Sequence, residues 1–243
     1  MTPEPVVIVH PDKQALADAA AARLVTALLD VQARSDEARI ALTGGSLGSE
    51  IIASVTQVPG QRAVDWTRVR VWWGDERYLP RGDPDRNDTQ NDEAGLTDLG
   101  LDQAKVHRVQ GPDESDSAEA SAAAYAATFQ QHRQGFDVVV LGMGPDGHVA
   151  SLFPHHQAQR VTDAIAVAVH DSPKPPPDRV SLTFECLARS REIWFLVAGA
   201  DKAESVAAAL NPSSNPWDVP ASAPKGTEAT RWLIDAAAAS RLP

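Results

Sequence analysis

The chain of 243 residues is 43% hydrophobic and 23% charged, which is typical of a globular protein with one large domain or two small ones. Its formal net charge of −11 at pH 7 argues against nucleic acid as a partner, because phosphates bind basic surfaces. The single cysteine, Cys186, excludes an internal disulfide and a cysteine-based zinc site. The sequence shows no signal peptide and no apolar run of membrane-spanning length, so we expect a cytoplasmic protein with no membrane partner.

Predicted strands and helices alternate along the chain. Apolar, β-branched runs predict strands at 6–9, 39–43, 68–74, 137–141, 164–169, 180–184 and 193–198. Helical spacing predicts helices at 12–33, 46–55, 115–133, 202–210 and 227–239, the first of them capped by Asp12. Polar residues predict a loop that runs into a helix at 80–92 and a second loop at 211–224.

This order of elements predicts the fold class. Strands that alternate with helices require crossover connections, which favour a parallel sheet covered by helices. We therefore predict an α/β, Rossmann-like three-layer sandwich with a mainly parallel sheet and helices on both faces. Because the sequence contains no internal repeat and no obvious linker, we expect 1–243 to form a single domain.

The most informative segment is 141–154, which follows the strand predicted at 137–141 and carries His148 at the far side of a glycine-rich loop. Ligands bind at strand ends in α/β proteins, and histidine exchanges protons near neutral pH. His148 is therefore the first candidate for proton transfer. Two alternatives remain for this loop: a structural glycine turn, and a dinucleotide-binding loop with glycines at 142, 144 and 147. Pro145 interrupts the glycine pattern of a dinucleotide-binding loop, and no strand that ends in an acidic residue follows at the expected distance.

A second candidate site lies where the strand at 39–43 passes into a helix, at Thr43, Gly44, Gly45 and Ser46. Backbone N–H groups at a helix start bind phosphate, and glycine lets the anion approach closely. The two hydroxyls would add donors. The alternative is a tight turn in which Ser46 is only the N-cap.

Charged side chains follow three other predicted strands or loops. Asp75 and Arg77 end the strand at 68–74, so Arg77 could bind a phosphate or carboxylate and Asp75 a histidine or sugar hydroxyl. Arg179 follows a stiff proline segment, and Lys202 opens a helix. Each of these positions has an alternative as an ordinary solvated surface residue. His155 and His156 lack metal-ligand spacing with His148, so we expect no metal site.

Together and in this order, these motifs resemble those of the 6-phosphogluconolactonase family over nearly the whole chain. The matching segments are 43–47, 73–77, 85–87, 142–148, 150–154, 174–179 and 199–202. Departures are few: Thr43 replaces a common serine, Gly48 a proline and Val149 a threonine. Arg86 replaces a serine and is expected at the rim of the pocket.

The resemblance implies an enzyme of the oxidative pentose phosphate pathway that hydrolyses 6-phospho-D-glucono-1,5-lactone without metal or organic cofactor. His148 would be the general base, oriented by Asp146 or Asp75. The residues expected to hold the substrate are Thr43, Gly44, Gly45, Ser46, Arg77, Gly144, Arg179 and Lys202. A backbone N–H of Gly144 or Gly147 would stabilise the oxyanion.

Two other functions stay open. Aminosugar-phosphate deaminase/isomerases resemble this chain at the histidine motif but typically carry a glutamate at the position of Phe153. The absence of that carboxylate argues against the deaminase reaction for this chain. A sugar-phosphate binding protein without catalysis is the second alternative. The sequence also leaves open whether the protein is a monomer or a homodimer.

Overall fold

The computed structural model describes residues 3–130 and 135–243. A six-stranded sheet in the order β1-β9-β8-β5-β2-β3 forms its centre, and every neighbouring pair in it is parallel. The strands of this sheet are β1 (Val6–His10), β2 (Ala38–Leu42), β3 (Val69–Trp73), β5 (Val138–Gly142), β8 (Glu192–Val197) and β9 (Ala229–Asp235). The α-helices are α1 (Lys13–Gln32), α2 (Gly45–Gln57), α3 (Asn87–Glu93), α4 (Ala118–Gln130), α5 (Phe184–Ala188) and α6 (Ala203–Leu210).

Short 3-10 helices link several of these elements, at Pro59–Ala63, Trp66–Arg68, Leu96–Leu99, Gln103–Lys105, Gln157–Arg160, Ala200–Lys202 and Pro220–Ser222. Asp12 caps α1 as predicted, since its side chain accepts the N–H of Ala15 at 2.8 Å. Within the described residues, no helix has the length and apolar character needed to cross a membrane.

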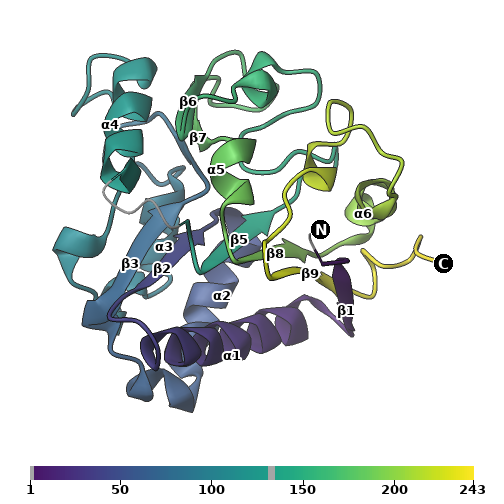
Figure 1. The fold of residues 1–243 in the computed structure, drawn as a ribbon, viewed down its shortest axis with the longest axis horizontal. Helices are drawn as coiled ribbons and strands as arrows, with labels where there is room; N and C mark the ends of the chain where they lie inside the picture. Colours follow the sequence, from purple (N-terminus) through teal and green to yellow (C-terminus); the bar gives the residue numbers. More distant parts are fainter. Residues whose placement is uncertain (1–2, 131–134) are drawn as a thin grey trace.

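Helices cover both faces of the sheet, which confirms the predicted three layers (Figure 1). Successive side chains of a strand point to opposite faces, and β8 shows this directly. Phe195 packs in a core with α4, α5 and α6, whereas Trp194 and Leu196 pack in the core that α1 and α2 cover. Two hydrophobic cores, one on each side of the sheet, therefore hold the layers together.

A second, antiparallel sheet lies beside the main one and contains β4 (Asp75–Arg77), β7 (Arg179–Leu182) and β6 (Ala166–Val169) in that order. The strands predicted at 164–169 and 180–184 are thus present, but as members of this smaller sheet. Its register places Arg77 opposite Arg179. Because β4 follows β3 after one glycine, this pairing brings two cationic side chains to the carboxyl edge of the main sheet.

The helix predicted at 227–239 is wrong, because β9 occupies its first half and lies between β1 and β8. Trp232 and Ile234 enter one core and Leu233 the other, so the segment is buried on both faces. This burial and the β-branched and aromatic residues outweigh the helix propensity of the alanines that follow. The helix predicted at 115–133 begins at Ala118, and its predicted end at 131–133 lies outside the described residues.

Candidate active site

A cleft of about 340 Å³ opens at the carboxyl ends of the parallel strands, where ligands bind in this class of sheet. The loops that follow β2, β3, β5 and β8 line it, together with the loop that leads into β7. The residues that line it are Thr43, Gly44, Gly45, Asp75, Arg77, Asn87, Gly142, Met143, Gly144, Pro145, His148, Ala150, Lys174, Pro175, Arg179 and Lys202. The fold thus gathers most of the predicted site residues in one place.

His148 and Asp146 form the central pair of this cleft. Nδ1 of His148 lies 2.5 Å from Oδ1 of Asp146. Although partial burial opposes it, the hydrogen bond from His148 and the nearby charges of His148 and Lys174 hold the pKa of Asp146 below its usual range. Asp146 is therefore an ionised partner that can orient the imidazole near neutral pH.

The loop that carries this pair depends on Gly144. A Cβ at this position would lie 2.0 Å from Cε1 of His148 and 2.5 Å from Oδ1 of Asp146, so only glycine leaves room for both side chains. The N–H of Gly144 donates to the carbonyl of His148, and the N–H of Gly147 donates to the carbonyl of Gly144, both at 3.0 Å. Because both N–H groups are used inside the loop, the predicted oxyanion role of either glycine is not supported.

Asp75 does not contact His148, so of the two acids considered it is Asp146 that lies against the imidazole. Asp75 is buried, and its Oδ2 accepts the hydroxyl of Ser151 at 2.5 Å. The amide of Asn87 donates to the carbonyl of Asp75 at 2.7 Å, and Nη1 of Arg179 lies 3.9 Å from its carboxylate. Asp75 therefore organises the floor of the cleft.

Arg179 holds the proline loop in place. Its side chain is almost fully buried, and its Nη2 donates to the carbonyls of Lys174 and Pro175, both at 3.1 Å. Nε reaches the carbonyl of Pro176 at 3.3 Å. The guanidinium lines the cleft, but most of its donors shape the loop that presents Lys174.

Arg77, Asn87 and Gly44 form one wall. Nη1 of Arg77 donates to Oδ1 of Asn87 at 2.6 Å, which fixes its guanidinium at the cleft. A Cβ on Gly44 would lie 1.8 Å from the same Asn87 oxygen, so this glycine is required for close approach. The sequence analysis included Asn87 only within the matching segment 85–87 and gave it no role of its own; that segment was the available signal.

The helix start at 44–46 offers fewer free donors to an anion than the sequence analysis predicted. Helix α2 begins at Gly45 with Gly44 as its N-cap, so Ser46 is not the cap. The hydroxyl of Ser46 accepts from Nζ of Lys13 at 3.2 Å and is absent from the cleft lining, and the N–H of Gly45 donates to Gln90 at 3.1 Å. Thr43, Gly44 and Gly45 line the cleft beneath the helix start.

Lys202 and Lys174 complete the cationic lining. Lys202 ends the 3-10 helix Ala200–Lys202 and lies 3.4 Å from Oδ2 of Asp201. Lys174, which the sequence analysis treated only as part of a loop, places its Nζ 3.5 Å from Asp146 and 3.3 Å from Nδ1 of His148. Four cationic side chains therefore converge on one cleft of an acidic protein, which favours an anionic ligand.

Arg86 is a buried structural residue and does not lie at the pocket rim, contrary to expectation. Its guanidinium makes two bonds of 2.8 Å to the carboxylate of Asp88. Glu76 lies beside it, and its carboxylate accepts the N–H of Asn87 at 2.7 Å and that of Asp88 at 2.9 Å. This network fixes the start of α3, and with it Asn87, against β4.

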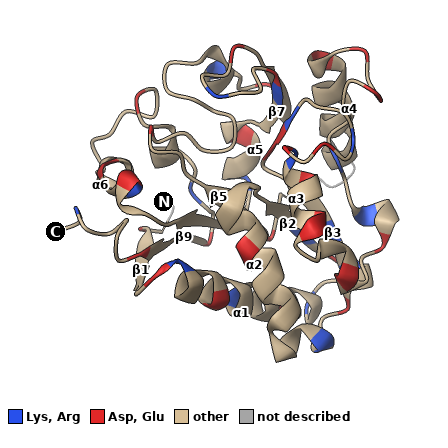
Figure 2. Ribbon diagram, turned by 180° about the vertical axis from the view of Figure 1, so that it is seen from behind, with Lys and Arg blue, Asp and Glu red and all other residues tan. Residues whose placement is uncertain are grey.

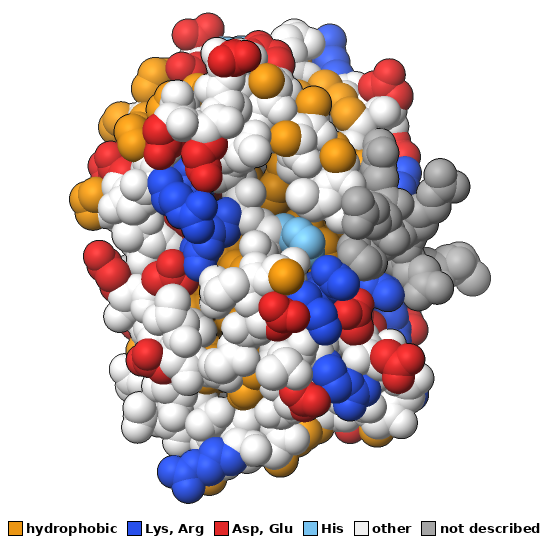
Figure 3. Space-filling view, turned by 90° about the vertical axis from the view of Figure 1, so that its left-hand side faces the viewer, with side chains coloured by type: hydrophobic (Ala, Val, Ile, Leu, Met, Phe, Trp, Pro, Cys, Tyr) orange, Lys and Arg blue, Asp and Glu red, His pale blue; other side chains and the backbone are white. Residues whose placement is uncertain are grey.

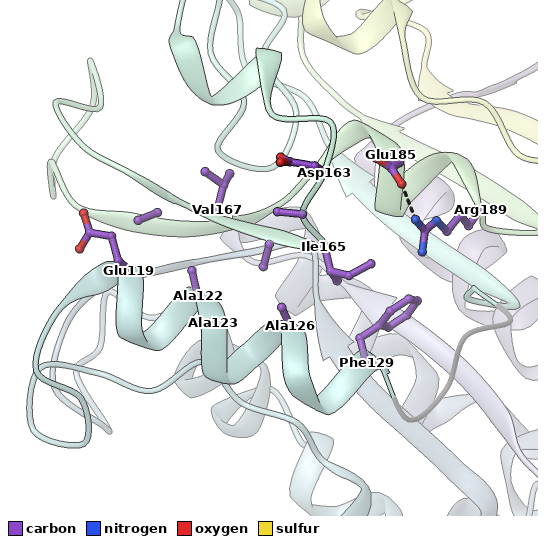
Figure 4. A pocket seen from close by; sticks show the side chains of 13 residues that line it. Glu119, Ala122, Ala123, Ala126, Phe129, Asp163, Ile165, Val167, Glu185 and Arg189 are labelled. Carbon is purple, nitrogen blue, oxygen red and sulfur yellow. Dashed lines mark hydrogen bonds and ion pairs between the residues drawn. The ribbon is translucent and has the colours of Figure 1, made fainter.

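A wider hollow lies between α4 and β6 (Figure 4). Apolar side chains such as Ala122, Ala126 and Ile165 form its walls, and Glu185 and Arg189 pair with each other at its side. Its described lining residues include no convergent cationic donors and no proton-transfer pair, so the smaller polar cleft is the better candidate site.

Charge elsewhere on the described surface is dispersed. Figure 2 shows basic and acidic residues interspersed along the outer helices, and Figure 3 shows Lys and Arg in separate groups, most of them near Asp or Glu. The described residues on the face in Figure 3 form no continuous basic surface of the kind that binds nucleic acid.

The comparisons with known proteins agree over almost the whole chain. The family model described as glucosamine-6-phosphate isomerases/6-phosphogluconolactonase matches residues 11–232. A relative from Streptomyces coelicolor named 6-phosphogluconolactonase is 46% identical, over 100% of this chain and 97% of its own. A relative of the same name from Mycobacterium tuberculosis is 40% identical, over 97% of each chain.

Solved structures show the same relationship. The 6-phosphogluconolactonase from Trypanosoma brucei superposes with a TM-score of 0.85 at 26% identity, covering 99% of both chains. A monomeric glucosamine-6-phosphate deaminase has a TM-score of 0.82 at 19% identity, covering 97% of this chain and 99% of its own, which is a likeness of fold alone. The chain therefore belongs to the glucosamine-6-phosphate isomerase/6-phosphogluconolactonase family.

Proposed function

We propose that this protein is a cytoplasmic, single-domain 6-phosphogluconolactonase. It hydrolyses 6-phospho-D-glucono-1,5-lactone to 6-phosphogluconate, the second step of the oxidative pentose phosphate pathway. The observation that carries the proposal is the His148–Asp146 pair, which shares one cleft with Arg77, Lys174 and Lys202. Such a cleft offers a proton acceptor and an anion-binding wall together, and the names of the full-length relatives point to the same reaction.

The cationic wall anchors the substrate phosphate. Lys202 and Arg77 supply charged donors, and the start of α2 beneath Gly44 adds a favourable helix dipole. Arg179 contributes through the loop that it holds and through its charge. Anchoring at the phosphate fixes the ring and brings the lactone carbonyl toward His148, which reduces the entropic cost of reaction.

The proposed mechanism needs one base and one water molecule. Nε2 of His148 takes a proton from water while the water oxygen attacks C1 of the lactone, which gives a tetrahedral oxyanion. As the carbonyl re-forms, the bond from C1 to the ring oxygen breaks, and His148 returns the proton to that oxygen. Asp146 accepts the Nδ1–H of His148 throughout and so keeps Nε2 available as the base.

The surroundings of His148 favour a lactonase over an aminosugar-phosphate deaminase. The position where those relatives carry a glutamate is Phe153, which is 1% exposed. Its ring packs against the imidazole with a centroid distance of 4.5 Å. An apolar ring cannot exchange protons during ring opening, so this cleft lacks the second acid–base group of the deaminase reaction.

The test is lactone disappearance at neutral pH with freshly prepared substrate and subtraction of the spontaneous rate. We expect rapid hydrolysis that His148→Asn reduces by about 10²–10⁴ in kcat with little change in KM. His155→Asn is the matched control, because this histidine is exposed and lies outside the cleft. A wild-type rate equal to the blank would overturn the proposal, and turnover of glucosamine 6-phosphate would then support the deaminase.

A further inference from the structure

We propose that Ser205 is a positioning residue for the His148–Asp146 pair, because it ties the loop that carries this pair to the helix that begins beside Lys202. The hydroxyl of Ser205 donates to the carbonyl of Pro145 at 2.5 Å. Ser205 is not among the residues that line the cleft, so it acts through Pro145. The inference rests on the proposed function only in taking His148 as the base.

Hydrogen bonds tie the backbone of the loop 144–148 to other segments at two points within the described part of the chain. The N–H of Ala221 donates to the carbonyl of Gly147 at 2.9 Å, and the hydroxyl of Ser205 makes the second tie. The N–H groups of Gly144 and Gly147 donate inside the loop itself. Of the two ties, only that of Ser205 comes from a side chain, so a substitution can remove it without any change in the sequence of the loop.

This tie acts on the part of the loop that packing holds least. Pro145 and Asp146 are exposed, whereas Gly144 and Gly147 are buried. A proline has no N–H, so its carbonyl is the only backbone group through which a hydrogen bond can hold Pro145. The peptide bond that contains this carbonyl is planar and leads directly into Asp146. A shift of Pro145 therefore moves the carboxylate that orients His148.

The contact between His148 and Asp146 is sensitive to such a shift. Nδ1 of His148 lies 2.5 Å from Oδ1 of Asp146, and a hydrogen bond weakens steeply when its length and angle leave the favoured range. A misplacement of about 1 Å in a catalytic group can cost about a hundredfold in rate. The bond to Pro145 therefore bears on the chemical step although it lies outside the cleft.

The helix that supplies Ser205 also begins at the cationic wall. Lys202 lines the cleft and is the N-cap of α6, and Ser205 lies in the first turn of the same helix. Ala203 and Val206 are buried, so this turn is fixed to the core. One turn of helix therefore holds both the cation that we assign to the substrate phosphate and the loop of the base. Ser205 thus helps to set the distance between the phosphate anchor and His148.

Proton NMR of the imidazole tests this inference without turnover. A hydrogen bond from Nδ1–H of His148 to Asp146 moves that proton far downfield and slows its exchange with water, and His148→Asn assigns the resonance. Ser205→Ala removes the donor to the loop, and Ser205→Thr keeps a hydroxyl. Ser214→Ala is the matched control, because the hydroxyl of Ser214 also donates to a carbonyl at 2.5 Å, that of Ala208 near the far end of α6.

We expect the downfield resonance in the wild type, in Ser205→Thr and in Ser214→Ala. In Ser205→Ala it moves upfield and exchanges with water about tenfold faster, because the loop opens more often. Alanine is the better helix former, so the substitution does not weaken α6 itself. A resonance unchanged in Ser205→Ala, equally changed in Ser214→Ala, or absent from the wild type overturns the inference.

Kinetics give a second readout if the lactonase activity is present. Ser205→Ala lowers kcat by about 10–10² and leaves KM within about twofold, because Lys202 and the other cations stay in place. Ser205→Thr restores most of kcat, and Ser214→Ala leaves both constants unchanged. A variant Ser205→Ala that loses thermal stability but keeps the kcat of the wild type contradicts the inference. A wild type without turnover refutes the proposed function alone, since the NMR result does not depend on it.

Discussion

Replacement of Arg86 by methionine tests whether the buried charge network supports the fold as the structure indicates. Arg86 is fully buried, with two bonds to Asp88 and further bonds of 2.9 Å to the carbonyl of Leu79 and 2.7 Å to that of Val109. Methionine fills much of the same volume but supplies no charge. The change leaves the Asp88 carboxylate and the neighbouring Glu76 carboxyl group buried without their main cation.

The expected cost follows from that arrangement. Removal of one partner from a buried ion pair destabilises a protein by about 3–5 kcal/mol, because the remaining charge stays buried. For a chain of this size, that corresponds to a fall in Tm of roughly 6–20 °C. Arg81→Met is the matched control: Arg81 pairs with Glu114, but its side chain is 62% exposed. We expect that control to lose less than about 1 kcal/mol.

The destabilisation caused by Arg86→Met is expected to change with pH in a defined direction. Burial opposes ionisation of Asp88, but the hydrogen bonds and charge of Arg86 hold its pKa below the ordinary 3.8. Such a depressed carboxyl stabilises the fold above its unfolded pKa, and this contribution is lost as pH falls through the folded value. Burial, followed by the charge of Asp88, raises the pKa of Glu76 to about 8. Without Arg86 both folded pKa values rise, so the folded state of the variant binds extra protons.

The loss of unfolding free energy in Arg86→Met, relative to the wild type, is therefore expected to be larger at pH 8 than at pH 5. Urea unfolding followed by tryptophan fluorescence at both pH values measures it, with the wild type and Arg81→Met beside it. A loss below 1 kcal/mol, or a deficit that grows as pH falls, would show that the network does not carry the buried charge in the way described.

Three other changes have defined outcomes. Asp146→Asn lowers kcat by about 10²–10⁴ because the amide carries no charge to stabilise the imidazolium that forms during proton transfer; steady-state kinetics with unchanged circular dichroism checks this. Gly144→Ala displaces His148, whose ring lies 2.0 Å from the new Cβ, and lowers kcat about 10²-fold with a smaller effect on KM. In the wild type, hydrogen bonds to Asp178 and Glu119 raise the pKa of His170, and His170→Gln removes this protonated imidazole. Its stabilisation is present below pH 6.5 and lost as pH rises through the folded pKa, so the difference in Tm from the wild type shrinks between pH 6 and pH 9.

Local patterns in the sequence predicted most elements because burial and propensity agreed there. The strand predicted at 137–141 is apolar and largely β-branched from Val138 onward, and it corresponds to β5 in the middle of the sheet. Asp12 precedes an apolar helical repeat and caps α1. At 227–239 the two signals disagreed: alanines favoured a helix, but the space between β1 and β8 required a strand. Only the tertiary partners decide such a case.

The candidate site was predictable as a set of motifs, but the roles within it were not. Glycines beside His148 and at 44–45 mark places where side chains approach closely, and sequence spacing can show that much. Asp75 belongs to the small antiparallel sheet, which places its carboxylate against Ser151 and Arg179 and leaves Asp146 as the acid that contacts His148. That sheet forms between strands about 100 residues apart, so no local pattern announced it.

Arg179 illustrates the same limit and bears on how the cleft works. Its charge and its place after the prolines predicted a ligand-binding residue, yet three loop carbonyls take most of its donors. The loop it fixes carries Lys174, whose side chain is 39% exposed and whose Nζ lies 3.3 Å from Nδ1 of His148. Arg179 thus shapes the cleft by holding this loop, and Lys174 supplies a cation to the cleft lining. Arg179→Lys should therefore lower kcat by displacing the loop that carries Lys174, and steady-state kinetics that show an unchanged kcat in this variant would contradict that role.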